Sequence, residues 1–251
     1  MKDQINIKFL NDCLLINNIL IVGDIHIGYG TLFYEKSVAS GLQLKEIIGK
    51  FNCIFKYLKK ENIKIDKIIQ LGDFKHDFNT ITDVEWREIL RLLDYFIKKV
   101  GNKNIIIIKG NHDNILKPIL NKRKIKLFNF FKIKIGRRVL FFLHGDKLNR
   151  NYLNSDFLFL GHLHPSISLY DQYKKEIYKC FLQGIWKGKK VYILPSFNNV
   201  SYGFDLRNIK KNYWNKKLFI INNSYLKNFY VIIYNNKEKK EYNFGKLKKF
   251  I

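Results

Sequence analysis

Five of the six histidines gather in short blocks with aspartate, asparagine or glycine, and a Gly-Asp block completes the set. The blocks are Gly23-Asp24-Ile25-His26, Gly72-Asp73, Gly110-Asn111-His112-Asp113, His144-Gly145-Asp146 and Gly161-His162-Leu163-His164. Each follows an apolar, strand-like run, and α/β proteins bind their ligands beyond the carboxyl ends of the strands. Any one block could be an ordinary glycine turn, but five in this arrangement predict a hydrolytic centre with two metal ions.

The spacing inside the blocks indicates how metal ligands could converge. Asp24 and His26 are separated by one residue, so in extended backbone their side chains project to the same side and can meet one ion. His162 and His164 repeat this spacing. Asp73 ends another apolar run, and its two carboxylate oxygens can bridge two ions.

The remaining block residues divide between metal and substrate. Asn111 and His112 are adjacent, so their side chains diverge, and one can bind metal while the other faces the substrate. His144 supplies a further imidazole. Nitrogen and oxygen donors without a thiolate suit two divalent ions, and we expect Mn²⁺, with Fe, Zn²⁺ or Mg²⁺ as alternatives. Two such ions about 4 Å apart can hold a bridging hydroxide for in-line attack on a phosphoryl group.

The segments between the blocks predict the elements that position them. Apolar runs at residues 19–22, 67–71 and 105–108 indicate strands, and helical spacing of apolar residues marks 42–58 and 83–99. This alternation predicts parallel pairing through right-handed crossovers. Further strands are expected at residues 128–135, 139–143, 157–160, 181–186, 191–194 and 229–234, with a solvated hairpin tip at 237–241.

Bulk properties favour one α/β domain over residues 1–251, with 47% hydrophobic residues for its core. No apolar stretch approaches the ~18 residues of a membrane span, and the first residues do not resemble a secretory signal. The three cysteines, Cys13, Cys53 and Cys180, are far apart and odd in number. We therefore expect buried thiols in the reducing cytoplasm and no membrane partner.

The formal net charge of +25 has two possible explanations. Basic surface attracts phosphate backbones, which favours a nucleic-acid partner. Alternatively, the abundance of lysine, asparagine and isoleucine reflects AT-rich codons, and the charge is a matter of composition. The charge alone does not decide between them.

The ordered set D-x-H, G-D, G-N-H-[DE], H and G-H-x-H resembles the calcineurin-like metallophosphoesterases. The resemblance implies an α/β fold, a four-layer α/β/β/α sandwich of two mixed β-sheets. It also implies a metal-dependent phosphoesterase with two divalent ions. The ligands of the first ion would be Asp24, His26 and His164, those of the second Asn111, His144 and His162, with Asp73 as the bridge.

The same resemblance implies two catalytic residues. His112 would contact the substrate phosphate, stabilise the transition state and protonate the leaving oxygen. Asp113 would orient the His112 imidazole and fix its tautomer.

A narrower resemblance covers most of the chain. Segments 24–29, 71–76, 86–88, 194–198 and 244–247 resemble an archaeal and bacterial subgroup related to the SbcD nuclease, which includes the repair phosphoesterase PdeM. The subgroup implies DNA as partner and, by analogy only, a repair ligase or helicase. The chain is too short for the capping domain of the larger repair nucleases, so simple phosphodiester cleavage is expected in place of processive resection.

Several residues outside the metal ligands have both a functional and a structural interpretation. Lys75 and His76 follow Asp73, so they either contact a substrate phosphate at the rim or make local contacts. Asn198 binds a ligand or stabilises a turn, and Asp146 either supports His144 or only completes a turn. Tyr170 and Tyr173 are candidates for base stacking.

Three functions remain in competition. The leading one is a phosphodiesterase that acts as a nuclease on DNA in repair or processing. The alternative is a phosphoesterase on a nucleotide or another small phosphorylated metabolite. A non-catalytic scaffold with the same fold, as in a retromer subunit that resembles phosphoesterases, is disfavoured because His112 and all seven expected ligands are present. Salt separates the first two, because many phosphate contacts make activity fall steeply with ionic strength.

Overall fold

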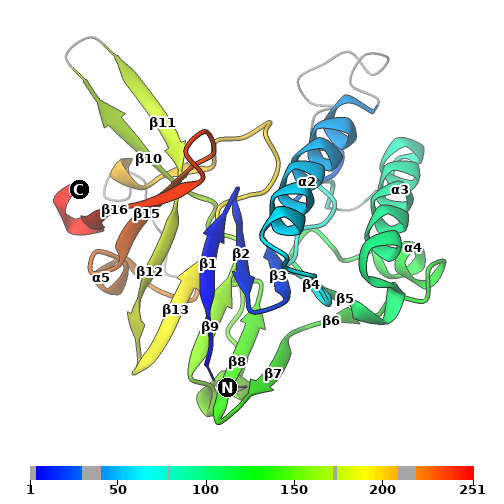
Figure 1. The fold of residues 1–251 in the computed structure, drawn as a ribbon, viewed down its shortest axis with the longest axis horizontal. Coiled ribbons are helices and arrows are strands. Elements are labelled where there is room, and N and C mark those ends of the chain that lie inside the picture. Colours follow the sequence, from blue (N-terminus) through cyan, green and yellow to red (C-terminus); the bar gives the residue numbers. More distant parts are fainter. Residues whose placement is uncertain (1–3, 30–40, 79, 172–173, 209–218) are drawn as a thin grey trace.

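Two large β-sheets pack face to face in the computed structural model, which describes residues 4–29, 41–78, 80–171, 174–208 and 219–251 (Figure 1). The first sheet has six strands in chain order, and its last four strands are parallel. Its strands are β1 (Ile7–Leu10), β2 (Cys13–Ile16), β3 (Ile19–Val22), β4 (Lys67–Gln70), β5 (Ile105–Ile108) and β6 (Leu127–Phe128).

The second sheet has seven strands in the order β16-β15-β12-β13-β9-β8-β7. Its pairs β8–β9 and β9–β13 are parallel, and the other pairs are antiparallel. The strands are β7 (Phe131–Ile135), β8 (Arg138–Leu143), β9 (Phe157–Leu160), β12 (Phe181–Trp186), β13 (Lys189–Ile193), β15 (Tyr230–Asn235) and β16 (Lys240–Lys246). Both large sheets are therefore mixed, as expected.

Alternating side chains of the two sheets form the core between them. Ile21 and Ile69 of the first sheet meet Phe142 and Phe159 of the second in one buried cluster. The other face of the first sheet packs against α2 (Leu42–Lys60) and α3 (Asp83–Val100). A capping box of Thr82 and Glu85 begins α3. The layers α, β and β of the expected sandwich are thus present, and the α/β fold class is confirmed.

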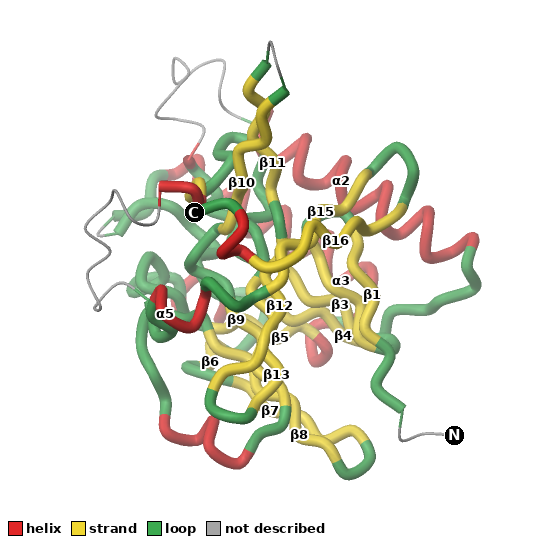
Figure 2. The backbone as a smooth tube through the Cα atoms, turned by 90° about the vertical axis from the view of Figure 1, so that its left-hand side faces the viewer, coloured by secondary structure: helices red, strands yellow, loops and turns green. Residues whose placement is uncertain are grey.

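Short elements cover the outer face of the second sheet. They include a small sheet of β10 (Pro165–Tyr170), β11 (Lys175–Lys179) and β14 (Phe204–Asp205), and the helix α5 (Asn223–Leu226). Ile167 and Leu226 of these elements join the buried cluster on that face. β10 and β11 extend away from the large sheets in both ribbon views (Figures 1 and 2). In the described residues, this fourth layer therefore contains less helix than the expected sandwich.

Most expected elements are present, with some changes at their ends. The region 128–135 divides into β6 and β7, because residues 129–130 carry the chain from one sheet to the other. β1, β2, β10, β11 and β14 were not expected, nor was the short helix α4 (Lys117–Asn121). A hairpin is present where it was expected, but its tip is at residues 236–239, because Lys240 and Glu241 already belong to β16 and pair with β15. Cys13 and Cys180 are buried, but Cys53 on α2 is exposed, contrary to expectation.

The parallel strands bring the histidine blocks to common edges. Asp24, Asp73 and Asn111 follow β3, β4 and β5, whose carboxyl ends lie at one edge of the first sheet. His144 and His162 follow β8 and β9, which are parallel neighbours in the second sheet. The site is therefore assembled from both sheets, where their strand ends meet.

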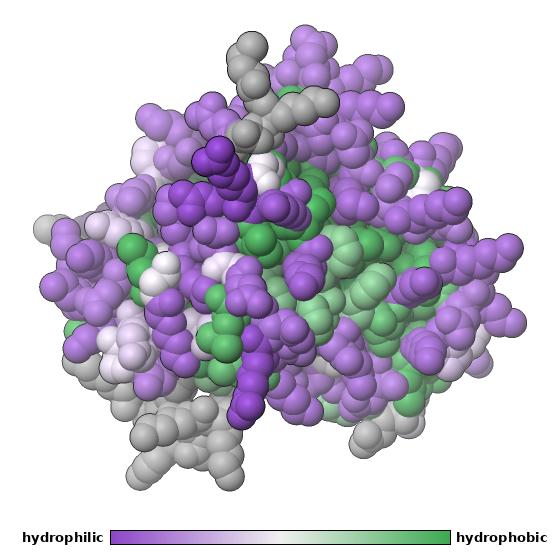
Figure 3. All heavy atoms as spheres, turned by 90° about the horizontal axis from the view of Figure 1, so that it is seen from below, coloured by the Kyte–Doolittle hydropathy of each residue, from purple (hydrophilic) through white to green (hydrophobic). Residues whose placement is uncertain are grey.

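No helix of the described residues is long and apolar enough to cross a membrane. Hydrophilic side chains cover most of the face seen in Figure 3, with apolar side chains showing between them.

Candidate metal centre

The first group of side chains surrounds the buried carboxylate of Asp24. Its Oδ2 lies 2.9 Å from His164 Nε2, and His164 Nε2 lies 3.4 Å from His26 Nε2. The backbone N–H of His162 donates to Asp24 Oδ1 at 3.0 Å, which holds the carboxylate in place. The ligand atoms of Asp24, His26 and His164 all lie within 4.8 Å of one another, as one metal ion requires.

The second group surrounds His144, which is fully buried. Its Nε2 lies 3.0 Å from Asn111 Oδ1, 3.0 Å from His162 Nδ1 and 3.3 Å from Asp73 Oδ2. Its Nδ1 lies 2.9 Å from the carbonyl oxygen of Leu71, which fixes the tautomer and leaves Nε2 for a metal.

Asp73 lies between the two groups. Its Oδ2 is 3.3 Å from His144 Nε2 in the second group and 3.7 Å from His26 Nε2 in the first. Its Oδ1 accepts the backbone N–H of His112 at 2.9 Å. The structure thus brings together all seven side chains that the sequence predicted as ligands.

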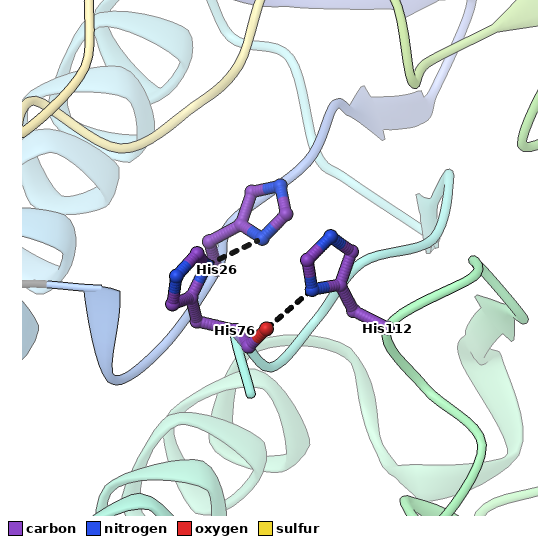
Figure 4. A group of neighbouring side chains, drawn as sticks. All are labelled: His26, His76 and His112. Carbon is purple, nitrogen blue, oxygen red and sulfur yellow. Dashed lines mark hydrogen bonds between the residues drawn. The ribbon is translucent and has the colours of Figure 1, made fainter. Parts of the chain in front are cut away.

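His26, His76 and His112 form a third group beside the first, with ring nitrogens within 4.8 Å of one another (Figure 4). His76 Nδ1 lies 3.4 Å from His26 Nδ1, and His112 Nδ1 hydrogen-bonds to the His76 carbonyl oxygen. His112 Nε2 lies 3.8 Å from Asp73 Oδ2. The imidazoles of His76 and His112 therefore lie next to the metal ligands and are partly accessible, so a substrate can reach them.

The electrostatics of the site suit divalent cations. Burial lowers the pKa of His26 to about 3, so its imidazole is neutral and can bind a metal. Burial also acts to lower the pKa of His144, but the carboxylates of Asp73 and Asp24 outweigh it and raise that pKa to about 10. Burial acts to raise the pKa of Asp24, yet His164 and His144 lower it overall. Two buried carboxylates thus draw positive charge into a cluster of nitrogen and oxygen donors, which fits two divalent ions.

The backbone is strained at the ligands. His26, Asp73, His162 and His164 have φ angles of 50°, 51°, 62° and 47°, a region that residues other than glycine seldom occupy. The glycine before His162 allows a close approach, because a Cβ on Gly161 would overlap Asp24 Oδ1. Strain of this kind costs about 1–3 kcal/mol per residue and clusters at functional sites.

Two buried amides that the sequence analysis missed hold the ligand turns. Gln70 bonds to the backbone N–H and the carbonyl of Gly72, and its Nε2 also donates to Gly23 O at 3.3 Å. Gln43 Nε2 donates to His26 O at 2.8 Å. A glutamine inside the apolar run Ile68-Ile69-Gln70-Leu71 was the available signal, because a buried amide needs hydrogen-bond partners.

Two lysines hold the loop after β13 against the centre. Lys50 Nζ donates to Phe197 O at 2.9 Å, and Lys179 Nζ donates to Ser196 O at 2.8 Å. The N–H of Phe197 in turn donates to Asp24 O at 2.7 Å. Burial lowers the pKa of Lys179 to about 7. The loop is therefore part of the support of Asp24.

Two expected roles are corrected by the contacts. The Asp113 carboxylate accepts the backbone N–H groups of Phe74 at 2.9 Å and Gly110 at 3.0 Å, so it holds the turns, while the His76 carbonyl is the partner of His112 Nδ1. Lys75 is not at the rim: its side chain is fully buried and its amine donates to Asp77 O. The bridge between Ile27 and Lys75 draws this residue inward.

The other expected residues also have defined places. Asn198 is buried, and its Oδ1 accepts the N–H of Ser201 at 3.1 Å, a contact that stabilises the turn. Asp146 lines a cavity with Asn111, and its charge is among those that raise the pKa of His144, while the Leu71 carbonyl holds the His144 ring. Tyr170 is 62% exposed on β10 under Arg207, and Tyr173 lies outside the described residues.

Three solved structures of other proteins match this chain over most of its length. Nuclease MPE of Pseudomonas putida matches with a TM-score of 0.58 and 16% identity, over 91% of this chain and 92% of that chain. The E. coli phosphoesterase YfcE has a TM-score of 0.41 and 12% identity, over 89% and 95%. Vps29 of Chaetomium thermophilum has a TM-score of 0.38 and 15% identity, over 90% of each. The likeness to nuclease MPE, at 16% identity, shows a shared fold.

Curated proteins give no sequence match to the chain. The sequence model of the calcineurin-like phosphoesterases, however, matches residues 18–191. That span contains all seven ligand residues, His112, and the strands β3 to β9 that carry them. The protein therefore belongs to the calcineurin-like phosphoesterase family of metal-dependent phosphoesterases.

Proposed function

We propose that the protein is a phosphodiesterase that uses two metal ions and acts on nucleic acid, with DNA repair or processing as its setting. The position of Asp73 carries this proposal. One oxygen of its carboxylate lies 3.7 Å from a nitrogen of His26 and 3.3 Å from a nitrogen of His144, which belong to separate groups of ligands. A carboxylate so placed can contact two ions at once.

In this proposal the ligands would divide between the two ions as the family resemblance implies. Asp24, His26 and His164 would hold one ion, and Asn111, His144 and His162 the other, with Asp73 shared. Two divalent ions bound there, Mn²⁺ in our proposal, would activate water and neutralise the charge of the phosphoryl group.

His112 is placed to act on the substrate. Its Nδ1 is held by the His76 carbonyl, and its Nε2 lies 3.8 Å from Asp73 Oδ2 at the edge of the centre. Its side chain keeps 12% of its surface exposed, so a phosphate oxygen can reach the ring. In its doubly protonated form, Nε2 would donate to the phosphate and deliver a proton to the leaving oxygen.

A polar cavity beside Asn111 supports a substrate with more than one phosphate. Its volume is about 380 Å³, and Lys109 and Lys147 are among its lining residues, with Asn114 and Asn129. Two ammonium groups next to the centre can pair with phosphates that flank the reacting one. The formal charge of +25 would add long-range attraction for a polyanion.

The test is Mn²⁺-dependent hydrolysis of bis-p-nitrophenyl phosphate beside labelled single- and double-stranded DNA, each at two salt concentrations. We expect both to be hydrolysed, and DNA cleavage to fall steeply as salt rises. His112→Asn should lower both rates by about 10²–10⁴-fold while the fold is kept.

The same experiment addresses the other functions. Turnover of the small diester without DNA cleavage would move the assignment to a nucleotide or another small phosphorylated metabolite. Absence of both activities in protein shown to bind two Mn²⁺ ions would contradict the proposal and favour a scaffold.

A further inference from the structure

An exposed aromatic side chain stands on the ring of His112. Phe78 follows Asp73 by five residues and keeps 47% of its surface exposed. Its ring centroid lies 3.6 Å from that of His112, and the two planes are inclined by only 30°. One face of Phe78 therefore covers the imidazole, while the exposed part of the side chain faces solvent beside the centre.

The aromatic surface continues past His112. The rings of His112 and His76 are nearly parallel, at 21°, with centroids 5.4 Å apart. Tyr29 lies 4.3 Å from His76 in turn. Figure 4 shows His76 and His112 reaching toward the same space from two different segments. Rings from Tyr29 to Phe78 thus form one continuous aromatic wall, defined by Tyr29, His76, His112 and Phe78.

Phe78 is much more exposed to solvent than the phenylalanines near it. Phe74, four residues earlier, is fully buried, as are Phe51 and Phe96 of the adjoining helices. Leaving an apolar ring in water forgoes about 1.5–3 kcal/mol of burial. A ligand that covers the ring would recover part of this free energy.

The two flanks of the centre differ in chemistry. The aromatic wall lies on the side of His26 and His76, whereas the cavity with Lys109 and Lys147 lies beside Asn111. A nucleotide has matching parts, a flat base and anionic phosphates. Aromatic side chains that stack on bases do so with little sequence preference, because every base has a π-face.

We propose that Phe78 stacks on a nucleobase of the substrate, next to the phosphate held at the metal centre. This inference rests on the proposed phosphoesterase function and narrows its substrate class to nucleotides and nucleic acids. His112 then contacts the phosphate with its ring edge while Phe78 binds the base attached to it.

The test compares two ligands that differ in the nucleoside. Binding of thymidine 5′-monophosphate and of methyl phosphate is measured by calorimetry in Mn²⁺, with wild type, Phe78→Ala, Phe78→Tyr and Phe244→Ala. Phe244 is a matched control, since it is also exposed, at 39%, but lies on β16.

We expect wild type and Phe244→Ala to bind the nucleotide about ten- to a hundredfold more tightly than methyl phosphate. Phe78→Ala should lose most of that preference, and Phe78→Tyr should retain it. Equal affinity of wild type for both ligands would overturn the inference. So would an equal loss for both ligands in Phe78→Ala, because Phe78 would then only support His112.

The test of base stacking and the test of diester hydrolysis can fail independently. A protein that hydrolyses diesters but shows no base preference keeps its function and loses the stacking role. A protein that prefers the nucleotide but hydrolyses no diester keeps the stacking role and loses the function.

Discussion

At the scale of single residues, the centre depends on backbone conformations that are unfavourable elsewhere. Four of the seven ligand residues have positive φ, and each is in a block that contains glycine. The surrounding contacts maintain these conformations: His26 N donates to Asp73 O at 2.9 Å, and His162 N donates to Asp24 Oδ1 at 3.0 Å. In these two contacts, one block therefore holds the ligand of another block.

Gly161→Ala should damage the centre through this mutual support. Its Cβ would overlap Asp24 Oδ1, and the buried carboxylate has little room to move. We expect a loss of about 1–3 kcal/mol in the free energy of unfolding, as for other overpacked sites. Weaker metal binding should accompany it. Chemical denaturation and equilibrium dialysis with Mn²⁺ measure the two effects.

Gly49→Ala is the control for this substitution. Gly49 lies in α2, and no atom lies within 4 Å of a Cβ built on it. Alanine should therefore stabilise the helix by about 0.5–1 kcal/mol and leave metal binding unchanged. If Gly161→Ala also left both stability and Mn²⁺ binding undiminished, the close packing of Gly161 against Asp24 would not be needed for the centre.

At the scale of elements, the loop after β13 links a helix, a strand and the centre. Lys50 of α2 and Lys179 of β11 donate to the carbonyls of residues 196–198, and Phe197 holds Asp24. Lys50 also forms an ion pair with Asp12. The ammonium group of Lys179 is largely desolvated, so this support has a pH dependence.

Stability should rise with pH because of Lys179. Its folded pKa is about 7, against ~10.4 in an unfolded chain. Between pH 7 and 10 the Lys179 amine is mostly neutral in the folded chain but protonated in the unfolded chain. The free-energy cost of releasing that proton on folding therefore falls as pH rises toward 10. The free energy of unfolding should gain about 1 kcal/mol per pH unit in this window.

Urea unfolding at pH 7, 8 and 9 measures this slope against Lys179→Met. The variant lacks the titrating group, so its stability should depend less on pH than that of wild type. Parallel pH profiles for the two proteins would show that Lys179 is solvated and not desolvated in its loop contact.

The sequence predicted several central strands from their apolar pattern, but it missed β2, although the run Cys13–Ile16 is also apolar and buried. Continuous apolar runs identified β3 and β5, since both are buried on two faces between helices and the second sheet. It missed β10 and β11, whose charged and polar residues lack a long apolar run. It joined β6 to β7 because the apolar residues continue through the change of sheet.

The candidate site shows the same limits. Strand ends and spacing predicted that the blocks converge, but the set of seven ligands came from the family resemblance, since spacing left open which of Asn111 and His112 binds metal. Strand ends and spacing were not enough for Lys75 and Asn198, which depend on where the following backbone turns. Phe78 was missed because an exposed phenylalanine has no signature in the sequence; only its contact with His112 reveals it.

At the scale of the whole molecule, the ligands join the two sheets. Asp24, Asp73 and Asn111 come from the first sheet, whereas His144, His162 and His164 come from the second. Ions bound between them would therefore resist separation of the sheets. The buried carboxylates of Asp73 and Asp24 raise the pKa of His144, so they favour positive charge between the sheets.

Mn²⁺ should accordingly stabilise the entire fold, because binding to the folded chain alone shifts the unfolding equilibrium. At a free concentration of about 100 times Kd, one ion adds about 2.7 kcal/mol, and a chain of this size gains about 2–4 °C in Tm per kcal/mol. With two ions bound, calorimetry with Mn²⁺ and with EDTA should thus show a rise of about 10–20 °C. Asp73→Asn removes the shared carboxylate charge and should abolish most of this rise, whereas Asp146→Asn, on the neighbouring cavity wall, should keep it. A Tm that EDTA and Mn²⁺ leave unchanged would mean that the blocks hold the two sheets together without metal.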